Sequence, residues 1–561
     1  MRARTTALIA LALGAAWLGV SGCGWEERLD APPPRAVRVA AWAQGAPVGS
    51  CAPLTSGAAT RLLARPGLGI NLSPVTPYAS QWVYVDAFRA SRLGRDPEWM
   101  LSGSGAPPAL DAQGYPRGLA SGQRARTLCL YGTEGDYPAG EYTLSFRGVG
   151  AVELGRDAEH CLLEHDGRGE ARARVLVRPT RRGISLTIVR SAPSDPVRDL
   201  HLVMPGFAAS YRARPFHPLF LARLRPFACL RFMDWTATNS SPVARWSERR
   251  PPDYRSQHRE VAWEDVLALC NALERPPWLC VPHRADQDYL RSLAELVRAR
   301  LDPRLPVLVE YSNEVWNGQF RQQREVAAAA RARGAPWEEE YARRAAAAFE
   351  AFRAALGPAR VLRVVSGQAA NVGVAKHILA ALPPGGADAL AIAPYFSAGR
   401  EVNRDPALSA GWSSADLLRA CRRDLERVRA MIVAHRALAA RYGLALVAYE
   451  GGQHLVGRGG ARDDLGLQAR FLAANRDPGM RALYREYLAL WEAEGGGLFC
   501  HYASCEQPDR SGDWGALESL RRGDAPKYRA LLDTVQEWER AALRTPGGES
   551  APPARPTPQQ R

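Results

Sequence analysis

From residue 201 onward, short apolar runs alternate with long amphipathic stretches, and this alternation constrains the fold more than any other feature. The runs occupy 227–235, 277–283, 306–314, 360–367, 389–396, 444–452 and 496–504. Runs that are apolar over most of their length are typical of parallel strands covered on both faces. Between them, stretches such as DYLRSLAELVRARL place apolar residues three and four positions apart, which indicates helices. The alternation therefore predicts an α/β fold with right-handed crossovers.

An eighth run, LGINLSP, lies earlier in the chain at 68–74. Eight strand–helix units predict a (β/α)₈ barrel, whose functional site lies at the carboxyl ends of the strands. The alternative is an open doubly wound sheet. We favour the barrel because the sequence shows no glycine-rich phosphate loop of the kind that a doubly wound sheet often carries.

Residues 101–200 have a different pattern, in which YTLSFRGVGAVEL, ARVLVRP and ISLTIVR form short β-type runs separated by Gly, Asp and Pro. We expect an inserted β-sandwich domain between the first barrel strand and its helix. The barrel would then consist of 66–100 and 201–545, followed by a disordered tail at 546–561.

The N-terminus begins with basic MRAR, an apolar segment TTALIALALGAAWLGV and the residues VSGC. This order resembles a bacterial lipobox, which implies a lipoprotein signal peptide at 1–22 and a lipidated Cys23. Residues 23–65 are predicted to be a linker. We expect an exported protein, lipid-anchored to the bacterial cell envelope. The alternative is an ordinary signal peptide followed by a chance cysteine.

The net charge of +15 does not indicate a nucleic-acid partner, because the basic residues are almost all Arg and are scattered along the chain. Histidine is scarce and no cysteine spacing resembles a zinc site, so no metal or other cofactor is expected. In an exported protein, Cys129 with Cys161 and Cys500 with Cys505 are candidate disulfides.

Polar and titratable side chains stand where the apolar runs end, which is where a barrel enzyme has its site. They are Arg231 with Asp234 and Trp235, His283, Asn313 with Glu314, Tyr395, Tyr449 with Glu450, and His501 with Tyr502. Taken singly, each has a structural interpretation, such as a helix-terminal carboxylate, an ion pair or a core side chain. Together they predict a site.

Glu314 and Glu450 end the fourth and seventh strands, which lie across the barrel mouth from one another. Two facing carboxyl groups are the equipment for glycoside cleavage, one protonated and one ionised.

Asn313-Glu314 on the fourth strand and Glu450 on the seventh resemble the signature of glycoside hydrolase clan A, a group of retaining barrel enzymes. The resemblance covers roughly 66–100 and 201–540. It implies that Glu314 is the acid/base, that Glu450 is the nucleophile and that Asn313 contacts the sugar 2-hydroxyl.

Matches to the clan's family-5 enzymes are looser. Arg231 corresponds to an arginine that supports the nucleophile, His283 to a histidine that contacts substrate, and Tyr395 to a tyrosine that bonds the nucleophile. Two positions depart from the family. Ala393 stands where a histidine is usual, and His501 with Tyr502 where a tryptophan stacks on the sugar.

Five tryptophans near strand ends are candidate platforms for a sugar ring, because flat rings pack on apolar surfaces: Trp235, Trp246, Trp316, Trp412 and Trp514. We predict a retaining glycosidase that acts on a β-linked poly- or oligosaccharide. The first alternative is a non-catalytic carbohydrate-binding lipoprotein on a degenerate barrel. The second is another barrel enzyme or a cell-surface assembly protein.

Overall fold

The structure is a computed structural model that describes residues 56–544. The predicted signal peptide, Cys23, most of the linker and the tail at 546–561 lie outside the described residues and remain predictions. No helix within 56–544 is both long and apolar enough to cross a membrane.

The predicted barrel is confirmed. Eight parallel strands form a closed ring, in which the last strand pairs with the first. In order around the ring they are β1 (Gly67–Asn71), β10 (Leu230–Arg231), β11 (Pro277–Val281), β12 (Val307–Tyr311), β13 (Val361–Ser366), β14 (Ala389–Ile392), β15 (Ala445–Ala448) and β16 (Leu498–His501).

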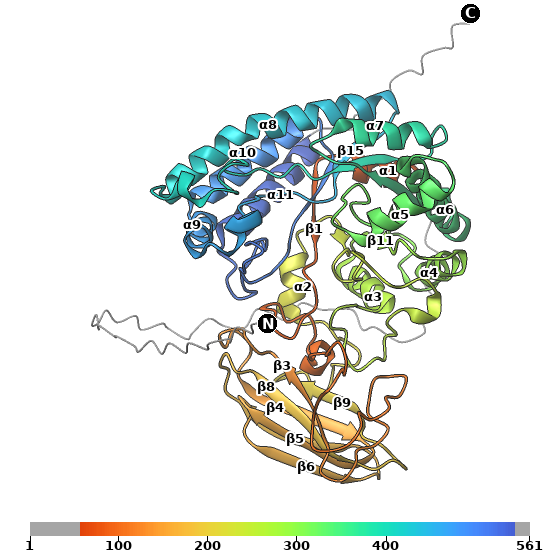
Figure 1. Cartoon of the computed structure of the whole chain (residues 1–561), viewed down its shortest axis with the longest axis vertical. Helices are drawn as coiled ribbons and strands as arrows, with labels where there is room; N and C mark the ends of the chain where they lie inside the picture. Colours follow the sequence, from red (N-terminus) through yellow and green to blue (C-terminus); the bar gives the residue numbers. More distant parts are fainter. Residues whose placement is uncertain (1–55, 545–561) are drawn as a thin grey trace, which may run out of the picture. The chain divides into compact units, whose positions relative to one another are not determined.

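Helices cover the outside of the barrel (Figure 1). They are α2 (Pro218–Leu224), α3 (Trp263–Leu273), α4 (Gln287–Arg300), α5 (Arg321–Ala332), α6 (Trp337–Leu356), α7 (Val372–Ala381), α8 (Ser414–Arg441), α9 (Leu465–Arg476), α10 (Gly479–Ala493) and α11 (Pro526–Arg544). Short 3₁₀ turns join some elements, at η1 (Ala87–Ala90), η2 (Trp246–Glu248), η3 (Pro358–Arg360), η4 (Pro406–Ser409) and η5 (Gly459–Asp463).

Side chains alternate between the barrel interior and the helix-facing side, because successive residues of a strand point to opposite faces. In β12, Leu308 belongs to the interior cluster, whereas Val307 and Val309 pack in the larger cluster between strands and helices. Interior positions of the other strands carry residues as different as Trp278, Ala391 and Cys500. Small residues opposite large ones let the interior fill without a channel.

The end of the predicted linker is a helix instead, α1 (Ser56–Ala64). Its Leu63 is 1% exposed and belongs to the interior cluster of the barrel. An apolar side chain that packs among the strands gives this segment a fixed place that a solvated linker would not have.

Between β1 and β10 the chain forms two antiparallel sheets, drawn in orange and yellow in Figure 1. The five-stranded sheet has the order β2 (Met100–Ser102), β3 (Arg124–Cys129), β8 (Ile184–Ser191), β5 (Val149–Arg156) and β6 (Cys161–Asp166). The three-stranded sheet has the order β7 (Ala171–Val177), β4 (Gly140–Arg147) and β9 (Arg198–Val203).

A buried carboxylate ties this β-region to the segment that follows β1. Asp86 caps η1 by accepting a hydrogen bond from the Phe88 backbone N–H, and it also accepts one from the Leu202 N–H. Its second oxygen lies 2.7 Å from His201 Nδ1 in β9. The sheet that contains β9 is thereby fixed to the chain as it leaves the barrel.

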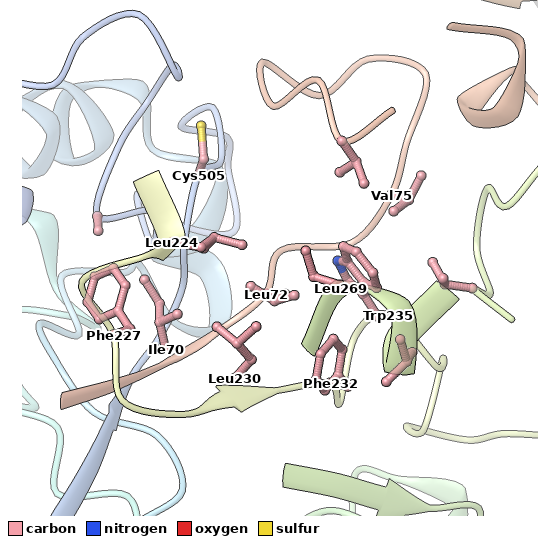
Figure 2. Close-up of a cluster of buried hydrophobic side chains, with 14 of the residues drawn as sticks. Ile70, Leu72, Val75, Leu224, Phe227, Leu230, Phe232, Trp235, Leu269 and Cys505 are labelled. Carbon is pink, nitrogen blue, oxygen red and sulfur yellow. The ribbon is translucent and has the colours of Figure 1, made fainter. Parts of the chain in front are cut away.

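The outer faces of β1 and β10 pack against α2 and α3 in the cluster of Figure 2. Ile70, Leu72, Leu230 and Phe232 meet Trp235 there. Burial of this many large apolar side chains stabilises the junction at which the β-region joins the barrel.

The candidate disulfides are absent from the structure. All eight cysteines in the described part of the chain are free thiols, including Cys129, Cys161, Cys500 and Cys505. Cys500 lies in the barrel interior, whereas Cys505 packs in the cluster between strands and helices. The two therefore lie on different sides of the strand layer, and closeness in sequence does not bring them together.

Gly69 in β1 is a position where the closed barrel leaves no room for a side chain. A Cβ there would lie 2.5 Å from Cys500 Sγ and 3.1 Å from the Cys229 carbonyl oxygen. We expect Gly69→Ala to lower the melting temperature by a few degrees, since overpacking costs about 1–3 kcal/mol. Differential scanning fluorimetry measures it.

Gly67→Ala, in the same strand, is the matched control, because its Cβ would meet nothing closer than 3.8 Å. An equal loss at both positions would show that glycine is needed for another reason than packing.

Candidate active site

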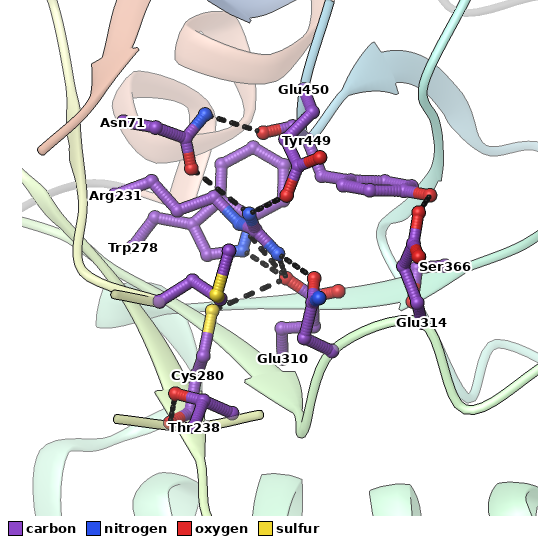
Figure 3. A network of polar contacts seen from close by, with 12 residues as sticks. Asn71, Arg231, Thr238, Trp278, Cys280, Glu310, Glu314, Ser366, Tyr449 and Glu450 are labelled. Atoms are coloured by element: carbon purple, nitrogen blue, oxygen red, sulfur yellow. Dashed lines mark hydrogen bonds and ion pairs between the residues drawn. The ribbon is translucent and has the colours of Figure 1, made fainter. Parts of the chain in front are cut away.

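Arg231 lies at the centre of the site and is 0% exposed (Figure 3). Its Nε and Nη2 donate to Glu310 Oε2 at 3.2 and 2.9 Å. Its Nη1 donates to Asn71 Oδ1 at 2.9 Å and to Glu450 Oε1 at 3.1 Å. Nη2 also reaches Asn313 Oδ1 at 2.8 Å. One guanidinium on β10 therefore holds four groups, from β1, β12 and the ends of β12 and β15, in a single arrangement.

Glu310 is the second fully buried charge of the site. Besides Arg231, its Oε2 accepts from Trp278 Nε1 at 2.9 Å and is 3.6 Å from Cys280 Sγ. It is 0% exposed and faces the barrel interior, like Leu308 two residues before it. A buried carboxylate needs a cation and hydrogen-bond donors, and Arg231 with Trp278 supplies both.

Glu450 follows β15 by two residues, and its two oxygens have different partners. Oε1 accepts from Arg231, and Oε2 accepts from the Tyr395 hydroxyl at 3.0 Å. The carboxyl group is thus bonded to a cation on one side and to a neutral donor on the other. Both bonds favour its ionised form.

Glu314 lies beyond the end of β12, at the start of the loop to α5. Its oxygens accept from the Tyr449 hydroxyl at 3.0 Å and from Asn317 Nδ2 at 2.8 Å. Glu314 and Ser312 both have positive φ, 43° and 59°. The left-handed region is unfavourable for residues with a side chain, so strain is concentrated in the turn that aims Glu314.

Asn313 connects the Arg231 network to the long loop that follows β10. Its Oδ1 accepts from Arg231, and its Nδ2 donates to Asn239 Oδ1 at 3.1 Å. Gln322 Nε2 holds both partners in place, by donating to Asn239 Oδ1 and to the Asn313 carbonyl oxygen. Hydrogen bonds at Oδ1, at Nδ2 and at the backbone carbonyl oxygen therefore fix the orientation of Asn313.

Burial raises the pKa of both catalytic candidates. The pKa of Glu450 rises to about 8, although Arg231 lowers it, with the charges of Glu314 and Asp234 adding to the rise. Burial also raises the pKa of Glu314, against the hydrogen bonds from Asn317 and Tyr449. Because the charge of Glu314 raises the pKa of Glu450, the two carboxyl groups titrate as a pair.

The charges of the network decide how this pair shares its protons. Arg231 neutralises one carboxylate, and Glu310 is bound to it by two of its nitrogens. Glu314 and Glu450 then have no second cation in the network, and two neighbouring buried carboxyl groups retain one proton between them. Glu450 alone of the two bonds directly to Arg231. We therefore assign the charge to Glu450 and the proton to Glu314.

Four half-buried side chains form an aromatic cluster beside Glu450: Tyr395, His454, Trp514 and Tyr502. Trp514 makes edge-to-face contacts with the other three at centroid distances of 5.7, 5.1 and 5.8 Å. The Tyr502 hydroxyl donates to Asp234 Oδ2 at 3.1 Å, and burial raises the pKa of Asp234 to about 6. Trp514 therefore lies beside Tyr502, although the sequence has no tryptophan at the end of the eighth strand itself.

Two predicted substrate contacts are corrected by the structure. Trp235 is 0% exposed, stacks on Phe220 and donates its indole N–H to the Ser73 carbonyl oxygen, so both ring faces lie in the core (Figure 2). His501 is also 0% exposed, and its Nε2 lies 3.3 Å from the Tyr484 hydroxyl of α10. Leu498 and Cys500 of the same strand point into the barrel. His501 follows Cys500 by one residue and therefore points outward, to the helices.

His283 and Trp316 lie outside the hydrogen-bond network of Arg231. His283 is 1% exposed, and its Nε2 lies 3.0 Å from Glu325 Oε2 of α5, which occupies that edge of the ring. Trp316 is half-buried, and its indole N–H has no partner among the described residues. Contact of either residue with a substrate remains a prediction.

The sequence did not assign Asn71, Asn239 or Glu310 to the site, and it placed Tyr449 at a strand end without giving it a role. Glu310 had a readable signal, because a charge at an inward position of an apolar strand must have a buried partner. Tyr449 had a weaker one, since it precedes Glu450 and also points inward. Asn239 had none, because it lies in the irregular loop between β10 and α3.

No group of three or more His, Cys, Asp and Glu side chains within 56–544 is arranged to hold a metal ion.

No known family profile matches the chain, and no curated protein sequence matches it either. Solved structures with a similar fold include a family-5 xyloglucanase from Bacteroides ovatus, with 10% identity, a TM-score of 0.31 and coverage of 74% of this chain and 96% of that chain. A family-10 structure from Paenibacillus barcinonensis has 12% identity, a TM-score of 0.34 and coverage of 56% and 90%.

An endo-β-1,4-mannanase double mutant from Cellulomonas fimi has 14% identity and a TM-score of 0.30, over 49% of this chain and 57% of that one. These neighbours are glycosidases. At such identities, the function of this chain follows only from its own side chains.

The raised pKa of Glu450 predicts how stability depends on pH. An unfolded glutamate ionises near roughly 4.3, whereas the folded pair of Glu314 and Glu450 keeps its shared proton until about 8, the pKa to which burial and the charge of Glu314 raise Glu450. The unfolded chain therefore releases the proton first, and the free energy of unfolding falls as pH rises through this range. We expect Glu450→Gln to show a smaller drop in melting temperature between pH 5 and pH 8 than the parent.

Glu141→Gln, at an exposed position of β4, is the control and should keep the parent's drop. An unchanged pH dependence in Glu450→Gln would contradict a raised pKa at that site.

Proposed function

We propose that the protein is a retaining glycoside hydrolase acting on a β-linked poly- or oligosaccharide, with Glu450 as nucleophile and Glu314 as acid/base. One observation carries the proposal. Two neighbouring carboxyl groups follow β12 and β15, and only Glu450 bonds to the buried cation Arg231. A protonated and an ionised carboxyl group at one site are what double displacement requires.

In the first step, Glu314 donates its proton to the glycosidic oxygen while the carboxylate of Glu450 attacks the anomeric carbon. The bond from that carbon to the leaving oxygen breaks, and a glycosyl ester of Glu450 forms. Tyr395 and Arg231 each hold one oxygen of Glu450, so the carboxylate approaches in a fixed orientation.

In the second step, Glu314 is ionised and takes a proton from water, whose oxygen attacks the same anomeric carbon. The ester bond breaks, Glu450 leaves as a carboxylate and Glu314 is protonated again. Two inversions give a product that retains the β configuration. This chemistry uses only the two carboxyl groups and water.

Asn313 supports substrate positioning in this proposal. One hydrogen of its side-chain amide bonds Asn239, and the other has no partner among the described residues. We propose that it donates to a sugar hydroxyl beside the reacting carbon. The half-buried Trp514, in contact with Tyr395 and Tyr502, offers an aromatic surface for the sugar ring at the same place.

Glu314→Ala and Glu450→Ala distinguish the two roles. We expect each to lower kcat/KM on a natural glycan by about a hundredfold or more. With an aryl glycoside, azide should rescue Glu450→Ala to an α-glycosyl azide, because azide replaces the nucleophile. It should rescue Glu314→Ala to a β-glycosyl azide, because it attacks the glycosyl-enzyme.

Nuclear magnetic resonance of the azide products reads their configuration. Reversed configurations would exchange the two roles, and hydrolysis at the parent rate by both variants would exclude this site. Binding of glycans by the parent without any product would favour the non-catalytic carbohydrate-binding alternative.

A further inference from the structure

Three arginines lie on the loops that follow β14 and β15, and we call Arg400, Arg404 and Arg458 the arginine cluster. All three are exposed, and none forms an ion pair with a carboxylate anywhere in residues 56–544. Burial lowers the pKa of Arg458, and the charges of Arg404 and Arg400 lower it further. Arg400 and Arg404 therefore lie close enough to Arg458 to act on it electrostatically.

Hydrogen bonds between the two loops fix the positions from which the cluster projects. The Arg458 N–H donates to the Asn403 carbonyl oxygen at 2.6 Å, and Asn403 Nδ2 donates to the His454 carbonyl oxygen at 3.0 Å. His454 in turn donates its N–H to the Phe396 carbonyl oxygen at 2.7 Å. Asn403 is 3% exposed, so the backbone beside Arg404 is anchored in the protein.

A continuous series of contacts joins the cluster to Glu450. Arg458 Nη2 lies 2.9 Å from His454 Nε2, which accepts because a guanidinium can only donate. The His454 ring contacts Tyr395 at 5.7 Å and Trp514 at 5.1 Å. Tyr395 bonds Glu450 directly. The cluster thus borders the aromatic surface on which we place the substrate.

Acidic side chains gather on another side of the same aromatic surface, where Asp513 is paired with Lys527 at 3.2 Å. Asp234 accepts from Tyr502, and Glu506, Asp509 and Asp513 lie on the loop after β16. The charges of Asp234, Asp509 and Asp513 all help to raise the pKa of Glu506, which burial raises to about 8. Neither these acids nor Glu401 and Asp405, which lie on the same loop as Arg400 and Arg404, form an ion pair with the arginine cluster within residues 56–544.

We propose that the arginine cluster binds the carboxylate of an acidic sugar, so that the substrate is a uronate-bearing glycan. The inference rests on the proposed function for placing a glycan at this mouth. Guanidinium groups match planar carboxylates with paired hydrogen bonds, and arginines without an ion-pair partner attract anionic ligands. The aromatic surface next to the cluster fits the sugar to which such a carboxylate is attached.

Binding without turnover tests this. The full-length protein carrying Glu314→Gln is titrated with glucuronoxylan, polygalacturonate and alginate, and with the same polymers after chemical reduction of their carboxyl groups. We expect at least one acidic polymer to bind about tenfold more tightly than its reduced form, as hydrogen bonds between charged groups allow. Adding Arg400→Gln and Arg404→Gln should cut this preference to about threefold or less.

Arg441→Gln is the matched control. Arg441 is an exposed arginine at the C-terminus of α8, at the opposite end of the barrel, and it has no ion-pair partner within 56–544. The preference for acidic polymer should survive this change. No preference in the parent, a preference that the double variant keeps, or equally tight binding of single-stranded DNA would each overturn the inference.

The two proposals fail separately. A chain that prefers acidic glycans but hydrolyses none would reject the proposed hydrolase and leave the arginine cluster in place. A chain that hydrolyses neutral glycans and shows no preference for acidic ones would support the proposed hydrolase and reject the role of the arginine cluster.

Discussion

The buried guanidinium of Arg231 is the interaction on which the site depends. It links β1, β10, β12 and the end of β15 through Asn71, Glu310, Asn313 and Glu450. Removing a buried cation would leave Glu310 as an uncompensated charge at the centre of the barrel, which is strongly destabilising. The same group therefore holds the strand ends together and favours the ionised form of Glu450, the proposed nucleophile. Arg231 therefore contributes both to the stability of the barrel and to the proposed chemistry of the site.

The alternation of the strands explains which side chains reach this centre. Arg231, Glu310 and Tyr449 occupy inward positions, so their side chains lie inside the barrel. Phe499 and His501 occupy outward positions, so their side chains pack against the helices. Beyond the strand ends the side chains no longer alternate, and the conformation of the turns decides where they point. The positive φ angles of Ser312 and Glu314 show how much the backbone is bent to bring Glu314 back over the mouth.

The fold was predictable because each barrel strand is a continuous apolar run followed by a helical period. The two carboxyl groups were predictable because they follow such runs. Trp235 and His501 were wrongly predicted to contact substrate because both lie near strand ends. The prediction did not take into account the direction in which each side chain points. Glu310 was missed because a charge inside an apolar run was taken as part of the strand. Asn239 could not be predicted, since only the folded loop brings it to Asn313.

The central claim is that Glu450 forms a covalent bond to the sugar. The most direct measurement incubates the protein with activated 2-deoxy-2-fluoro-β-glycosides, whose glycosyl-enzyme turns over slowly, and maps the adduct by peptide mass spectrometry. The account predicts one added glycosyl group, located on Glu450. A label on Glu314 or another residue, or release of an inverted product without any adduct, would contradict it.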